Sequence, residues 1–140
     1  MDKNLKLTTS VDIEAPPSKV WNALTDPKLI KQYFYGSKVT CDWKKGSPII
    51  FTGEWEGKPY VEKGEIVEID EGKRVMYSYL TAGLEDNPDN YALITYQLKD
   101  KGPNTTLTVI QEGFRNQEAY EHSVGGWNLI LEGLKDVVEK

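Results

Sequence analysis

The stretch HSVGGWNLIL, residues 122–131, decides how this 140-residue chain folds. It holds the only histidine, two adjacent glycines and one of the four tryptophans. In and after it, apolar residues recur at three- and four-residue spacing, as they do on one face of a helix. These residues are Val124, Trp127, Ile130, Leu131, Leu134 and Val138. The spacing predicts one long amphipathic helix from about residue 117 to residue 140.

The two glycines inside this predicted helix need an explanation. Each costs about 1 kcal/mol relative to alanine, so a gain elsewhere must offset the loss. We expect Gly125 and Gly126 to let the helix lie tight against a sheet, with Trp127 as the main anchor beside them. The alternative is that the glycines leave room at the mouth of a cavity.

Strand patterns dominate the rest of the chain. Residues 5–13 alternate apolar and polar side chains, which predicts a half-buried strand. Six strand-like runs follow, mostly separated by short turns that contain glycine. The runs span 37–43, 48–55, 59–69, 74–80, 91–98 and 105–114. Their order predicts an antiparallel meander, with an acidic surface loop at 81–90.

Two short helices are expected between the first strand and the meander. Pro16-Pro17 ends the strand, and Ser18 is expected to cap the first helix. Asp26-Pro27 is expected to start the second, since proline suits a first helical turn. The chain is thus predicted to be a single α+β domain over residues 1–140, in which the final helix covers one face of a curved sheet.

Composition and charge exclude several classes of function. The formal net charge is −5 and the pI is about 5.0, which disfavours nucleic acid and anionic membrane surfaces as partners. The N-terminus has no signal-peptide pattern, and Cys41 is the only cysteine, so we expect a cytoplasmic protein without disulfides. Motifs for zinc, phosphate loops and nucleophile elbows are missing, so no metal or cofactor is expected.

Tyrosines are concentrated in the predicted strands. They are Tyr60, Tyr77, Tyr79, Tyr91 and Tyr96. Rings with polar tips that face one volume are typical of a small-molecule lining. Any single tyrosine is more often satisfied by solvent or by a backbone carbonyl.

Four stretches of the chain resemble the START-like, helix-grip (SRPBCC) superfamily. They are APPSKVWNALTDPKLIKQYF (15–34), GEIVEI (64–69), TTLTVIQEGF (105–114) and the helix that follows His122. More narrowly, they resemble the branch homologous to the activator of heat-shock protein 90 ATPase. Tyr33-Phe34 stands where that branch usually ends its second helix with tryptophan. The resemblance implies about seven antiparallel strands wrapped on the C-terminal helix, with an internal pocket between them.

The implied pocket leads to the first hypothesis for function, which is non-enzymatic binding of a small hydrophobic or aromatic ligand. The candidate lining residues are Phe34, Phe51, Tyr60, Tyr77, Tyr79, Tyr96, Phe114, Trp127, Ile130, Leu131 and Leu134. His122 and Gln111 are candidate polar groups of the same pocket. A pocket filled by the protein's own aromatic side chains is the alternative.

Two other hypotheses stay open. The resemblance also implies a chaperone-associated interaction module, although we expect the helix-grip domain to occupy the whole chain and to leave no room for a further domain. Some START-like relatives, such as polyketide cyclases, use the cavity as enzymes. A cyclase- or hydrolase-like enzyme here would require His122, Gln111 and a tyrosine to converge. The residues favour binding over catalysis, and either a monomer or a homodimer is compatible with them.

Overall fold

The computed structural model describes residues 5–34, 36–114 and 116–139, apart from the side chain of Trp55. The first half contains β1 (Lys6–Ile13), α1 (Pro17–Thr25), α2 (Pro27–Tyr33), β2 (Lys38–Cys41), β3 (Pro48–Trp55) and β4 (Lys58–Asp70). The second half contains β5 (Arg74–Tyr79), a 3-10 turn at Pro88–Asn90, β6 (Ala92–Asp100), β7 (Thr105–Glu112) and α3 (Gln117–Glu139). This is the predicted order of one strand, two short helices, six strands and a long helix.

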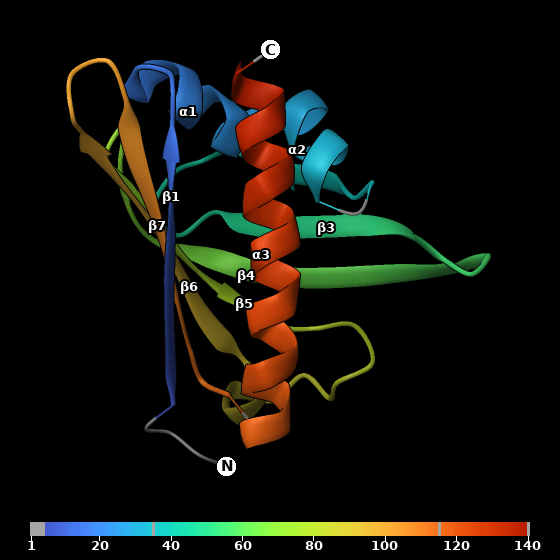
Figure 1. The fold of residues 1–140 in the computed structure, drawn as a ribbon. Helices are drawn as coiled ribbons and strands as arrows, with labels where there is room; N and C mark the ends of the chain where they lie inside the picture. The colour runs from blue at the N-terminus through green and yellow to red at the C-terminus, as the bar shows by residue number, and fades with distance from the viewer. Residues whose placement is uncertain (1–4, 35, 115, 140) are drawn as a thin grey trace.

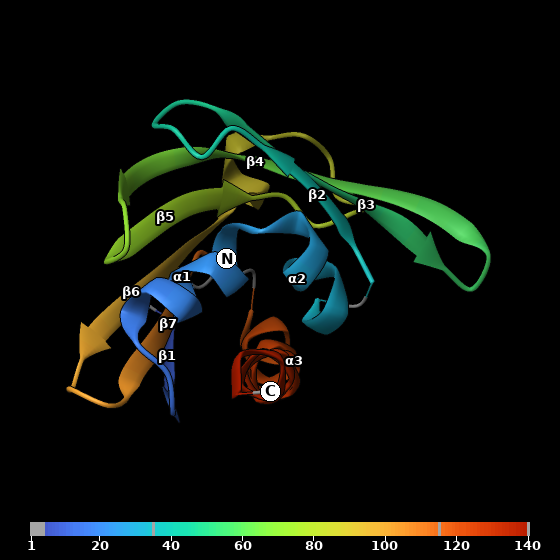
Figure 2. The same ribbon diagram turned by 90° about the horizontal axis from the view of Figure 1, so that it is seen from above.

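The seven described strands form one antiparallel sheet in the order β1-β7-β6-β5-β4-β3-β2. The first strand pairs with the last, so β1 closes the meander at one edge while β2 forms the other. The sheet is strongly curved, and α3 lies on its concave side (Figure 1 and Figure 2). The predicted α+β helix-grip arrangement is therefore confirmed.

The alternating pattern of the strands places their apolar side chains under α3. Leu7 and Ile13 of β1 and Leu107 and Val109 of β7 are buried, while their sequence neighbours are partly or fully exposed. The register aligns Leu7 with Gln111 and Ile13 with Thr105. Residues opposite each other in an antiparallel pair share a face, so these strands offer one continuous concave surface.

The two short helices begin in different ways. Pro16 is the N-cap of α1 and no side chain caps this helix, so the expected capping by Ser18 is wrong. Pro17 occupies the first helical position and has no N–H to satisfy, which lowers the need for a capping group. In α2 the Asp26 carboxylate accepts from the Lys28 N–H at 2.9 Å, as the Asp26-Pro27 pattern predicted.

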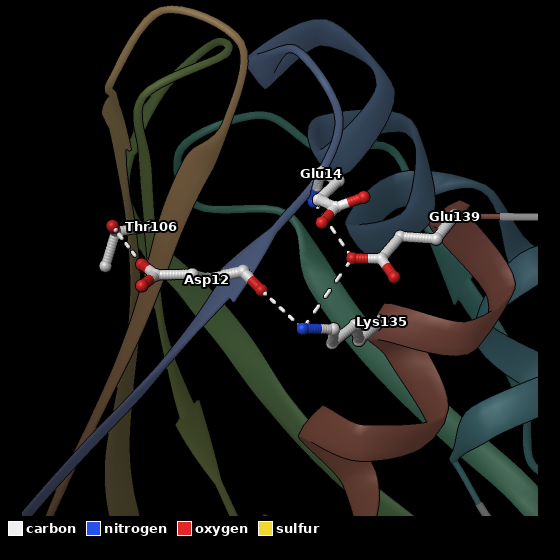
Figure 3. A network of polar contacts seen from close by, with 5 residues as sticks. All are labelled: Asp12, Glu14, Thr106, Lys135 and Glu139. Atoms are coloured by element: carbon white, nitrogen blue, oxygen red, sulfur yellow. Dashed lines mark hydrogen bonds and ion pairs between the residues drawn. The ribbon is translucent and has the colours of Figure 1, made fainter.

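The C-terminal end of α3 is hydrogen-bonded to the end of β1 and to Glu14, which follows it (Figure 3). Lys135 Nζ donates to the Asp12 carbonyl oxygen at 3.0 Å, and Glu139 Oε2 accepts from the Glu14 N–H at 2.9 Å. Asp12 in turn accepts from the Thr106 hydroxyl at 2.6 Å, which links this corner to β7. These contacts join the end of the helix to the edge of the sheet.

Gly125 of α3 behaves differently from the expectation. Gly125 is exposed, and a Cβ atom added there would meet nothing within 4 Å, so its predicted tight contact with the sheet is wrong. The close approach is at Gly133, where an added Cβ would lie 3.2 Å from Tyr33 Cβ of α2. At Gly133 the close approach of α3 is therefore to another helix, α2.

The apolar stripe of α3 is buried as predicted, with one exception. Trp127, Ile130, Leu131, Leu134 and Val138 are buried. Val124 is 37% exposed and lies at the edge of the stripe. Among the described helices, α3 included, none is both long enough and apolar enough to cross a bilayer.

Candidate functional site

Side chains fill one half of the space between α3 and the sheet. In this filled half, Phe34, Phe51, Tyr77, Tyr96 and Trp127 form a chain of ring contacts with centroid separations of 5.4–6.1 Å. The void left among its residues measures about 10 Å³, which is close to the space of one water molecule. This half therefore matches the expected alternative of a pocket that the protein fills with its own aromatic side chains.

Tyrosine hydroxyls inside the filled half stay protonated. Tyr33 Oη donates to the Ala23 carbonyl oxygen at 2.6 Å. Burial raises the pKa of Tyr33 and of Tyr77 well above the ordinary value, and the neighbouring Tyr96 adds to both shifts. Burial also raises the pKa of Tyr96 to about 12. The filled half thus contains neutral hydrogen-bonding groups.

The other half of the space is an open cleft of about 700 Å³. Its helix wall is the segment of α3 from His122 to Ile130, and its sheet wall includes Tyr60, Tyr79 and Ile94. Gly126 lines the cleft and is half-buried, which agrees with the alternative expectation that a glycine leaves room there.

A second cleft, of about 450 Å³, adjoins the first and leads toward Phe114 and the loop between β5 and β6. Both are lined by Tyr79, Thr81, Ala82, Gln111, His122 and Ser123. The two clefts therefore meet at these residues, under the first turns of α3. A ligand longer than one ring system could extend from one cleft into the other.

A carboxylate organises one wall of the larger cleft. Glu62 accepts a hydrogen bond from the Tyr79 hydroxyl and another from the Ala82 N–H at 3.0 Å. Burial first, and then the charge of Glu62, raise the pKa of Tyr79 well above its ordinary value. Tyr79 therefore remains a donor, and Glu62 holds the start of the β5–β6 loop against β4.

Two glycines shape the sheet wall. A Cβ atom at Gly53 would lie 2.6 Å from Tyr60 Oη, so the ring of Tyr60 lies across this glycine and its hydroxyl reaches Ser37 Oγ at 2.5 Å. A Cβ at Gly64 would lie 1.6 Å from the Ser78 carbonyl oxygen, so only glycine permits this approach of β4 to β5.

The predicted lining residues separate into three groups. Phe34, Tyr60, Tyr79, Trp127 and Ile130 line the larger cleft, and Phe114 lines the smaller one. Phe51, Tyr77 and Tyr96 lie in the filled half, where Phe34 and Trp127 also make ring contacts. Leu131 and Leu134 are buried in the core and line neither cleft among the described residues.

Both predicted polar groups line the two clefts, but they do not form a catalytic constellation. Trp127 Nε1 donates to Gln111 Oε1 at 2.6 Å, and Tyr79 donates to Glu62. His122 is exposed, and no hydrogen bond joins it to Gln111 or Tyr79 in the described part of the chain. The arrangement offers fixed donors and acceptors to a bound molecule.

Sequence reasoning missed Glu62, Ser37, Ser123 and the loop residues Thr81 and Ala82. Alternation along β4 offered one signal, because Glu62 shares a face with Tyr60, which was predicted to line the pocket. The loop residues carried no signal, since their place depends on how the loop folds back over the sheet.

Comparison with known proteins finds a matching family model and solved structures of the same fold. A family model described as "Activator of Hsp90 ATPase homolog 1-like protein" matches residues 14–139. The structure of ChR145 from Cytophaga hutchinsonii is 37% identical with a TM-score of 0.82, and the match covers 97% of this chain and 94% of that one. Among curated proteins, no sequence matches this chain.

Two further solved structures share the fold. MLL2253 from Mesorhizobium loti is 25% identical with a TM-score of 0.81, and the match covers 95% of this chain and 96% of that one. CalU16 from Micromonospora echinospora is 22% identical with a TM-score of 0.75, covering 95% of this chain and 75% of that one. The fold is therefore common to proteins of widely different sequence.

Proposed function

The chain belongs to the family of Activator of Hsp90 ATPase homolog 1-like proteins, and we propose that it binds one small hydrophobic or aromatic molecule between α3 and the sheet. The observation that carries this proposal is the open cleft of about 700 Å³ beside a core that is already filled. Ligand sites typically measure roughly 300–1,000 Å³, with mostly apolar walls and a few placed polar groups.

Apolar contact is the main source of affinity in this proposal. Burial of apolar surface contributes about 25 cal/mol per Å², before the cost of ordering the ligand. Phe34, Ile94 and Ile130 supply aliphatic and aromatic surface to the cleft, and the indole of Trp127 closes it toward the filled half. A flat, ring-containing molecule suits walls of this kind.

Binding without chemistry is supported by the way the polar groups are engaged. The Tyr79 hydroxyl donates to Glu62, and the Gln111 carbonyl oxygen accepts from Trp127. A general acid or base needs an orienting partner and access to the reacting atom. The exposed His122 has no such orienting hydrogen bond from the described residues. The polar groups therefore serve recognition in this proposal.

The first test is native mass spectrometry of the freshly purified protein, followed by organic extraction. We expect a stoichiometric extra mass that leaves on denaturation, or, for a weakly held ligand, binding of an added aromatic probe such as ethylnaphthalene. A clean apo mass together with no binding of the probe would overturn the proposal.

A matched pair of variants locates the binding. Ser123→Phe places a ring at the junction of the two clefts, whereas Asn128→Phe places the same ring on the exposed side of α3. We expect Ser123→Phe to abolish probe binding and Asn128→Phe to leave it unchanged. Equal binding by both variants would place the ligand elsewhere.

The family description supports a second candidate, an interaction with the chaperone Hsp90. Purified Hsp90 titrated with this protein would show complex formation by light scattering, and its ATPase rate would show any stimulation. Retention of the complex by Ser123→Phe would assign it to a surface other than the cleft.

A further inference from the structure

We propose that the cleft selects a neutral ligand bearing a carbonyl-type oxygen, and that the side-chain amide of Gln111 is the donor that recognises this oxygen. The inference rests on the binding function proposed above. It adds the chemical class of the ligand and a residue that determines specificity.

The orientation of the Gln111 amide follows from its partner. An indole N–H can only donate, so the atom 2.6 Å from Trp127 Nε1 must be the carbonyl oxygen of Gln111. The Nε2 group, with two N–H donors, is then turned away from the indole. Because Trp127 is buried and its N–H can only donate, this hydrogen bond sets the orientation of the Gln111 amide.

The Nε2 donors are available at the point where the ligand would pass. Gln111 lines both clefts, at their junction. Within residues 5–34, 36–114 and 116–139, the only hydrogen bond of the Gln111 side chain is the one from Trp127. A donor presented to an apolar cavity favours ligands that carry an acceptor, because an unmatched polar group loses its hydrogen bond to water.

Charge in the larger cleft disfavours an anionic acceptor. Glu62 places a half-buried carboxylate on the wall, whereas Lys58 and His122, which also line the cleft, are exposed to solvent. A ligand carboxylate would lose its hydration and meet the neutral amide of Gln111, and burial of a charge is costly unless an opposite charge pairs with it. A ketone, ester or amide oxygen bears no such penalty.

Three naphthalene derivatives substituted at the same ring position test this selectivity in calorimetric titrations of the wild-type protein. Acetylnaphthalene carries the acceptor, ethylnaphthalene has a similar shape without it, and naphthoate carries a negative charge. We expect acetylnaphthalene to bind about fivefold more tightly than ethylnaphthalene, the usual effect of one neutral hydrogen bond. Naphthoate should bind more weakly than acetylnaphthalene.

The variant Gln111→Glu separates the donor from the packing. A glutamate oxygen can still accept from Trp127, but the amide N–H groups are replaced by a second acceptor. We expect acetylnaphthalene to lose its advantage over ethylnaphthalene in this variant. A second measurement uses the wild-type protein and so does not depend on the folding of a variant. In it, the Gln111 side-chain amide resonances should shift with acetylnaphthalene far more than with ethylnaphthalene.

The outcomes distinguish the two proposals. If ethylnaphthalene and acetylnaphthalene both fail to bind the wild-type protein, the binding function falls and this inference falls with it. If both bind equally, or if naphthoate binds most tightly, the cleft remains a binding site and only the carbonyl specificity is overturned. Equal losses for both neutral probes in Gln111→Glu would also overturn the role of the donor.

Discussion

Under the concave face of one sheet, one half of the space is filled and the other is open. About 10 Å³ remains in the filled half, whereas the cleft measures about 700 Å³. The filled half lies where α1 and α2 insert between the sheet and α3 (Figure 2). Leu24, Ile30 and Tyr33 from these helices occupy it. The cleft begins where this third layer ends.

Trp127 stands at the boundary between the two halves. Its ring meets Tyr96 edge to face at 5.9 Å, and its Nε1–H bonds Gln111 at the junction of the clefts. Helix α3 thus packs against the core toward its C-terminal end and lines the clefts toward its N-terminal end. We infer that the filled half supplies most of the stability and that the cleft is left free for a ligand.

The largest expected effect is on stability, from a cavity made in the packed part of α3. Leu134 is 0% exposed, so Leu134→Ala should lower the free energy of unfolding by about 3 kcal/mol. Leu129, on the same helix, is 65% exposed and is the matched control, for which Leu129→Ala should change little. Urea unfolding curves of both variants measure the difference. Equal losses would contradict the assignment of the packed part of α3.

The second prediction concerns the buried tyrosines of the filled half and high pH. Tyrosines of the unfolded chain ionise near pH 10. Burial raises the folded pKa of Tyr96 to about 12, and it also raises the pKa of Tyr33 and of Tyr77 well above the ordinary value. Above pH 10 the unfolded state therefore binds fewer protons than the folded state. Stability is fully present below pH 10 and falls as the pH rises from there.

The variant Tyr96→Phe tests this slope. One such tyrosine lowers the free energy of unfolding by up to about 1.4 kcal/mol for each pH unit above pH 10. Between about pH 10 and about pH 12, the free energy of unfolding of Tyr96→Phe should therefore fall less steeply with pH than that of the wild-type protein. Urea titrations at several pH values measure the two slopes. Parallel curves would show that Tyr96 does not stay protonated in the folded protein.

The order of the elements was predictable from local patterns, because period two and period three-to-four require only neighbouring residues. The division between filled core and cleft was not. Tyr77 and Tyr79 are two residues apart on β5 and share a face of the sheet. Tyr77 nevertheless lies in the filled half, whereas Tyr79 lines the cleft. What separates them is the reach of α1 and α2 over the sheet, a tertiary feature that the spacing within one strand does not contain.

The glycines of α3 show the same limit. Gly125 and Gly126 are adjacent within a helical pattern and so give a local signal, whereas Gly133 gives none. Its contact is with Tyr33, one hundred residues earlier in the chain, and depends on the docking of α2. Similarly, the sequence does not distinguish Glu62 from a solvated carboxylate on a strand. Its role depends on the β5–β6 loop, whose Ala82 N–H donates to it.

The smallest expected effect compares these glycines directly, by Gly125→Ala and Gly133→Ala. Both substitutions gain up to about 1 kcal/mol of helix propensity. At Gly125 the new methyl group meets open space, so this variant should be more stable than the wild-type protein. At Gly133 the methyl group would lie 3.2 Å from Tyr33 Cβ, so α2 must yield and the gain should be cancelled or reversed.

Thermal or urea unfolding of the two variants measures the contrast, and both have the same composition, so effects on the unfolded chain are matched closely. If Gly125→Ala is more stable than the wild-type protein and Gly133→Ala is not, the close contact of α3 is with α2, at the filled half. Equal gains at both positions would mean that α3 is free to shift away from α2. The cleft would then be the product of a loosely held helix, and its volume would vary as the helix moves.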